Sequence, residues 1–115
     1  MDYKPIDLTE LNELEEMLKD AGIEYEREDN ENGTPDFKWE FHQLRCPETI
    51  LAGKKWLWDV ICNTGSYGSQ SGLLELWGRN ISEPEGWLRA EECFEKIKEI
   101  LKDYERSGEE KKSRE

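Results

Sequence analysis

The chain has 115 residues, of which 38% are charged and 35% are hydrophobic, and its net charge is −12. This length fits a single domain with a real core. The strong negative charge disfavours direct binding to DNA or RNA, because phosphate neutralisation requires clustered Lys and Arg. No apolar run is long enough to span a bilayer, and residues 1–4 lack the features of a signal peptide, so we expect a cytoplasmic protein.

The first expected element is a helix at residues 8–21. Asp7 and Glu10 have the spacing of a capping box, leucines recur at helical spacing from Leu8 to Leu18, and Gly22 is a natural stop. Four strands should follow. Residues 23–28, 37–44, 56–62 and 73–77 alternate or form short apolar runs, with turns expected at 29–35 and 52–55.

A loop is expected at residues 78–86, followed by a second helix at residues 89–106. Its apolar stripe runs from Leu88 to Tyr104. Residues 107–115 contain no apolar side chain and should form a disordered charged tail. The order of elements predicts an α+β fold in which residues 1–106 form one domain: a two-layer sandwich with an antiparallel sheet of about four strands and both helices on one face.

Most of the negative charge lies near the start of the chain. Residues 1–36 hold 13 acidic and 3 basic residues, which gives −10. A spaced row of carboxylates can dock on a basic cleft, although an acidic face can also serve only to keep a protein soluble. The residues expected to bind a partner protein are Glu10, Glu13, Glu24, Glu26 and Glu28, with Tyr67 as an aromatic anchor.

The segment from Asn63 to Gly72 is rich in glycine and serine and interrupts two apolar runs. It is not a Walker loop, because it lacks the Gly-Lys-Ser/Thr sequence and leads into a strand. It could be a plain connection, a protein-contact loop, or a nest of amides that holds a nucleotide. The nucleotide site would use Gly65, Ser66, Tyr67, Gly68 and Ser69, with Arg79 supplying the phosphate contact.

Other patterns give little support for catalysis or metal binding. Residues 28–33 begin like a calcium loop, but Trp39 stands at the twelfth position instead of Glu. His42 is the single histidine and is expected to be structural. Cys46, Cys62 and Cys93 are odd in number and widely spaced, which is typical of reduced thiols. We therefore expect no catalytic residues, no metal and no cofactor. Asp59, in the third strand, indicates that one side of the sheet is partly open, and aromatic residues left there would favour binding.

Several short motifs are similar to a pattern in small uncharacterised proteins of phages and prophages of Gram-positive bacteria. They are residues 58–62, 65–68, 72–75 with Gly78, and the two ends at residues 6–11 and 86–92. Such relatives often carry Thr where Arg89 stands, so the second helix would lack a hydroxyl cap. The resemblance implies a phage accessory role in the cytoplasm of a host bacterium, and no known chemistry.

These observations together predict a non-enzymatic, phage-encoded inhibitor of a host defence protein. Its acidic surface would dock on a basic nucleic-acid-binding cleft, as in anti-CRISPR-like proteins. The alternatives are a sponge that sequesters a nucleotide signal through the Gly/Ser/Tyr loop, and a structural or unassigned phage accessory protein. The expected partner is a host protein with a basic surface, with no direct nucleic-acid or membrane contact. The sequence leaves open whether the chain forms homo-oligomers.

Overall fold

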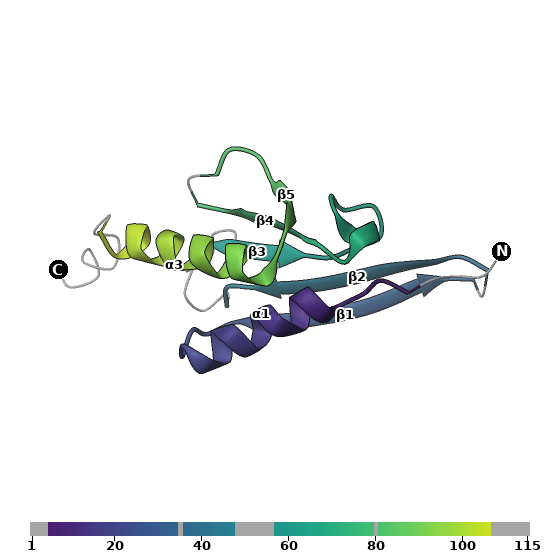
Figure 1. The fold of residues 1–115 in the computed structure, drawn as a ribbon, viewed down its shortest axis with the longest axis horizontal. Helices are drawn as coiled ribbons and strands as arrows, with labels where there is room; N and C mark the ends of the chain where they lie inside the picture. The colour runs from purple at the N-terminus through teal and green to yellow at the C-terminus, as the bar shows by residue number, and fades with distance from the viewer. Residues whose placement is uncertain (1–4, 35, 48–56, 80, 107–115) are drawn as a thin grey trace.

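The computed structural model describes residues 5–34, 36–47, 57–79 and 81–106. The order of elements, shown in Figure 1, is α1 (Thr9–Asp20), β1 (Glu26–Gly33), β2 (Lys38–Arg45), β3 (Trp58–Ile61), the short 3-10 helix η1 (Ser69–Ser71), β4 (Leu74–Gly78), β5 (Glu85–Leu88) and α3 (Ala90–Arg106). The expected turn at 52–55, the start of the third strand at Trp56 and the tail at 107–115 lie outside the described residues.

The five strands form one antiparallel meander in the order β1-β2-β3-β4-β5. Both helices lie against one face of this sheet, so the predicted two-layer α+β architecture is confirmed, with one strand more than expected. The core between the layers is formed by leucines of α1, the apolar stripe of α3 and the inward-facing side chains of the strands. Its residues are Leu11, Leu14, Leu18, Leu44, Cys46, Leu57, Trp58, Val60, Cys62, Leu74, Leu76, Leu88, Ala90, Cys93, Ile97 and Ile100.

The β1–β2 hairpin is longer than the sequence predicted. Most of the expected turn at residues 29–35 belongs to β1, which ends only at Gly33. The polar residues in this stretch resemble a turn, but an edge strand exposed to water tolerates them. Gly33 has φ of +123°, and a Cβ there would lie 2.5 Å from the carbonyl oxygen of Phe37. The reversal is therefore placed at Gly33, and the hairpin extends past the start of α1 (Figure 1).

A fifth strand, β5, occupies residues between the expected strand and helix: its first half was assigned to the loop at 78–86, and Leu88 was counted as the first residue of the apolar stripe. Only Leu88 of this strand is buried in the core, so the strand has no visible alternation. Its pairing with β4 is also irregular, with a register shift between Leu74 and Leu76. A strand of four residues with a bulge and one core contact leaves almost no periodic signal in a sequence.

The expected capping box at the start of α1 does not form. The Asp7 carboxylate accepts hydrogen bonds from the backbone N–H and the hydroxyl of Thr9, at 3.0 and 2.7 Å. Glu10 does not reach back toward Asp7. Its Oε1 instead accepts the backbone N–H of Ala90, the first residue of α3, at 2.7 Å. Glu10 therefore supplies the acceptor that Arg89 cannot, and it joins the two helices.

None of the helices within the described ranges is long and apolar enough to cross a membrane.

Candidate functional site

The two faces of the sheet differ in what covers them. The helices bury one face, whereas the other, which we call the open face, carries polar, charged and aromatic side chains. The strand register places these side chains in two rows that cross the sheet from β1 to β4. The first row is Glu26, Arg45, Asp59 and Trp77, and the second is Glu28, Gln43, Ile61 and Glu75.

Arg45 is the one basic side chain in these two rows, and it is already engaged. Its Nε lies 3.2 Å from Glu26, and its Nη1 lies 2.8 Å from Glu28 and 2.7 Å from the side-chain oxygen of Gln43. Hydrogen bonding to Glu28, followed by that to Glu26, raises the pKa of the guanidinium despite the opposing effect of burial. Two carboxylates therefore share one positive charge at the β1–β2 end of the open face.

Asp59 and Glu75 accept hydrogen bonds from neutral groups instead. Gln43 donates to Asp59 at 2.9 Å, and the backbone N–H of Tyr67 donates to Glu75 at 2.8 Å. Burial raises the pKa of the Asp59 carboxyl, and the negative charge of Glu75 adds to this, whereas the hydrogen bond from Gln43 and the charge of Arg45 oppose it. These two neighbouring carboxyl groups thus repel each other, and a cation brought close to them would relieve that repulsion.

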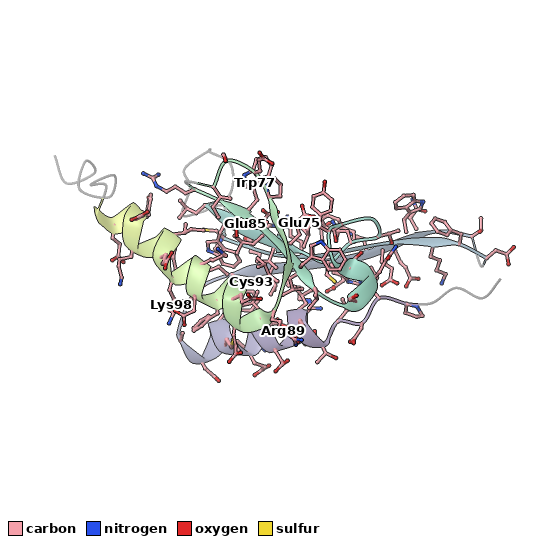
Figure 2. All side chains as sticks on the ribbon, turned by 45° about the horizontal axis from the view of Figure 1, so that its top comes forward. Glu75, Trp77, Glu85, Arg89, Cys93 and Lys98 are labelled. Carbon is pink, nitrogen blue, oxygen red and sulfur yellow. The ribbon has the colours of Figure 1, made fainter. Side chains whose placement is uncertain are left out.

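Two aromatic residues on this side of the molecule have exposed side chains. Trp77 is 50% exposed, and its indole N–H donates to the carbonyl of Ile81 at 2.8 Å. In Figure 2, Trp77 lies at the upper margin, away from α3 with its labelled Cys93 and Lys98. Tyr67 is 62% exposed, and its backbone is bound on both sides, by Glu75 and by the N–H of Trp87. A Cβ at Gly86 would collide with Tyr67, so this contact requires glycine.

The predicted acidic residues do not form a single surface. Glu26 and Glu28 lie on the open face, but they are half-buried ion-pair partners and not freely solvated groups. Glu24 precedes β1 and is exposed, beside a hollow of about 560 Å³ near Pro47. Glu10 and Glu13 belong to α1, which packs on the opposite face. Glu13 is exposed, whereas Glu10 caps α3, so the five carboxylates expected to bind a partner lie on both sides of the sheet.

Most backbone amides of the loop at residues 63–72 donate hydrogen bonds within the protein. Backbone N–H groups of seven of its residues donate within the protein, and Gly68 and Ser69, at the start of η1, are buried. Gly65 and Ser66 belong to a turn closed by the bond from the Ser66 amide to Asn63. The seven donors are Asn63, Thr64, Ser66, Tyr67, Ser69, Ser71 and Gly72.

Arg79 lies at the other end of β4 from this loop, a separation of roughly 13 Å along the strand. Its guanidinium carbon is 5.8 Å from the centre of the Tyr104 ring on α3. The structure therefore does not bring Arg79 together with Gly65, Ser66, Tyr67, Gly68 and Ser69. The loop residues that were expected to hold a nucleotide have no cation from Arg79 beside them.

His42 is enclosed by carboxylates on the helix side of the hairpin. Its two ring nitrogens lie 2.6 Å from Asp29 and 2.7 Å from Glu40, and Glu40 also accepts the backbone N–H of Ile6 at 3.0 Å. Burial raises the pKa of Asp29, but hydrogen bonds from Arg27 and His42 outweigh it, so the net pKa is lowered. Both ring nitrogens are occupied, which ties His42 to the strand network and leaves neither nitrogen for a substrate.

The three thiols are equally enclosed. Burial raises the pKa of Cys46 and of Cys62 to about 11 and that of Cys93 to about 12. They are protonated near neutral pH and are weak nucleophiles. Within the described part of the chain, no group of three or more His, Cys, Asp or Glu side chains is arranged to hold a metal ion.

In comparisons with known proteins, no family model, no curated protein and no solved structure matches this chain.

The residues of the open face were only partly predicted from the sequence. An open side near Asp59 and a contact through Tyr67 were predicted from the sequence, whereas Glu75 and Trp77 were missed as a pair. Their signal was the alternation of residues 73–77, which directs Leu74 and Leu76 inward and the other two outward.

Proposed function

We propose that this chain is a non-enzymatic binding protein whose open face docks on a basic surface of another protein. The observation that carries the proposal is the placement of two exposed aromatic side chains, Trp77 and Tyr67, beside Glu75, with the Trp77 indole fixed by its hydrogen bond and the Tyr67 backbone fixed by Glu75. Tryptophan and tyrosine are enriched among the residues that dominate binding energy at protein interfaces. An aromatic side chain that is already held in position loses little conformational entropy when a partner covers it.

The charge on the open face favours a basic partner. Four carboxyl groups, those of Glu26, Glu28, Asp59 and Glu75, accompany the single guanidinium of Arg45 in the two rows. The net charge of −12 also attracts basic surfaces over distance and repels nucleic acid. A lysine or arginine of the partner would relieve the repulsion between Asp59 and Glu75 and could stack on Trp77.

The resemblance to phage accessory proteins suggests a class of partner for this docking. The partner would then be a host protein with a basic nucleic-acid-binding cleft, and occupation of that cleft would inhibit it. The nucleotide-sponge alternative has less support, because the loop amides are bonded internally and Arg79 lies at the far end of β4. A binding protein of the first kind needs neither of these groups.

Affinity capture from a bacterial lysate tests the proposal with variants of the open face. We expect the wild-type protein to retain a basic protein whose recovery falls as salt is raised. Trp77→Ala should weaken retention at least about tenfold. Glu75→Gln keeps the acceptor for the Tyr67 amide and should weaken it less than Glu75→Lys.

The matched control is Lys98→Ala, which changes an exposed residue of α3 on the opposite side of the sheet. It should retain the same protein as the wild type. The proposal fails if every captured protein is retained equally by Trp77→Ala and by the wild type, or if capture is lost only in Lys98→Ala.

A further inference from the structure

The outer half of the β1–β2 hairpin carries a second feature, separate from Trp77 and independent of the proposed protein docking. A small cavity of about 270 Å³ lies where the loop after β3 runs beside β2. This volume is close to the lower limit for ligand pockets and suits a ligand of about one ring. The cavity is lined by Asn30, Glu31, Asn32, Trp39, Glu40, Phe41, Asn63 and Thr64.

An exposed aromatic side chain forms one wall of this cavity. Trp39 is 57% exposed, although it lies on a regular strand. Phe37 packs edge-on against it, with ring centres 5.5 Å apart and planes at 86°. The indole is therefore supported from one side by another aromatic ring, and more than half of its surface remains available to a ligand.

The polar side chains of the cavity are oriented by bonds to the backbone. The side-chain oxygens of Asn63 and Thr64 accept the N–H groups of His42 and Glu40, both at 2.7 Å. Because these bonds use the oxygen atoms as acceptors, the Asn63 amide nitrogen and the Thr64 hydroxyl hydrogen remain as donors. The Asn32 side-chain oxygen likewise accepts the N–H of Gly33 at 2.8 Å, which leaves its nitrogen as a third donor.

The cavity also offers acceptors but no cation. The amide nitrogen of Asn30 donates to Glu28 at 2.6 Å, so its oxygen is left as an acceptor. The two carboxylates in the lining are engaged elsewhere, Glu31 with Lys38 at 3.0 Å and Glu40 with His42 at 2.7 Å. Neither Lys nor Arg is among the lining residues, and nearby Lys38 is paired with Glu31, so a phosphate or carboxylate group would meet two carboxylates in the lining and no lining cation.

We propose that this cavity binds a neutral, polyhydroxylated ring, a pyranose sugar, stacked on Trp39. The apolar face of such a ring covers an indole, while each hydroxyl both donates and accepts. The hydroxyl groups around the ring can pair with the three donors, which are Asn32, Asn63 and Thr64, and with the acceptor of Asn30, because these residues come from β1 and from the loop after β3. A flat nucleobase, in contrast, presents its donors and acceptors in a single plane and satisfies fewer of these groups at once.

Titration of the ¹⁵N-labelled protein followed by NMR tests the site directly. The probes are methyl α-D-glucopyranoside, methyl α-D-mannopyranoside, N-acetyl-D-glucosamine and adenosine. We expect at least one sugar to shift the indole signal of Trp39 and the side-chain amide signals of Asn32 and Asn63 in a saturable way. Trp39→Ala should weaken this binding by more than about tenfold, and Asn32→Ala by a smaller factor.

Trp77→Ala is the matched control, because it removes an exposed tryptophan from the same face without touching the cavity. It should leave sugar binding unchanged, whatever it does to protein capture. Three results would overturn the inference. They are the absence of saturable shifts with every sugar, shifts produced by adenosine alone, and sugar binding that survives intact in Trp39→Ala.

Discussion

The bond between Glu10 and the start of α3 allows a sharp prediction about stability. Its carboxylate is only 19% exposed and accepts the Ala90 N–H at 2.7 Å, across 80 residues of sequence, with Arg89 at 3.5 Å. Loss of a helix-capping acceptor costs about 0.5–2 kcal/mol, and loss of a carboxylate near a helix N-terminus costs about 0.3–1 kcal/mol. We therefore expect Glu10→Ala to lower the free energy of unfolding by about 1–2 kcal/mol, or the Tm by roughly 4–8 °C.

Two variants separate the cap from a general loss of charge. Glu10→Gln keeps an oxygen acceptor and loses only the charge, so it should cost about 0.3–1 kcal/mol. Glu13→Ala, at an exposed position of the same helix, should change stability by less than about 0.5 kcal/mol. Denaturant unfolding followed by circular dichroism measures all three. The reasoning is wrong if Glu10→Ala is as stable as Glu13→Ala, or if Glu10→Gln is as damaging as Glu10→Ala.

Three further predictions follow from the buried and paired groups. The buried thiols of Cys46, Cys62 and Cys93 should not react with Ellman's reagent at about pH 8 in the native protein, and all three should react once denaturant is added. Rapid reaction of the native protein would contradict their burial. The pKa of the Asp29 carboxyl is lowered in the folded state, so its stabilisation is present above the unfolded value of about 4 and is lost as pH falls through the folded pKa. Asp29→Asn should therefore make the Tm fall less steeply as the pH is lowered below about 4, and an unchanged dependence of Tm on pH in this range would refute this. Glu28→Lys would place a second positive charge beside Arg45 and should lower the free energy of unfolding by about 0.5–1 kcal/mol. Glu24→Lys, at an exposed position, should leave it nearly unchanged. Equal Tm values for the two variants would mean that the ion pair between Glu28 and Arg45 does not contribute to stability.

The parts of the fold that the sequence predicted are those with a strong hydrophobic period. The leucines of α1 and the stripe of α3 mark their helices, and the alternation around Val60 and Leu76 marks β3 and β4. The end of β1 and all of β5 were missed. Asp29 to Asn32 are stabilised as a strand by pairing with β2, and β5 has one buried residue, so neither segment carries an apolar pattern of its own.

The candidate site was harder to predict than the fold, because it depends on contacts between distant segments. Glu10 was expected in a capping box with Asp7 and among the partner-binding carboxylates, but whether it meets Ala90 depends on how α1 packs against α3. Arg45 was not considered, although its pairing with Glu26 and Glu28 sets the charge at one end of the open face. Composition gave the acidic excess, whereas the partner of each carboxylate follows from strand register and helix packing.

The most direct test of protein binding through the open face is site-specific photo-crosslinking in a bacterial lysate. A photoreactive benzoylphenylalanine is introduced in place of Tyr67, where it keeps an aromatic ring at an exposed position, or in place of Lys98 on α3 as the control. The account predicts a discrete covalent adduct with a basic protein from position 67, no adduct from position 98, and loss of the adduct when Trp77→Ala is added. An adduct that forms equally from position 98, or that persists in full without Trp77, would contradict the assignment of the open face as the binding surface.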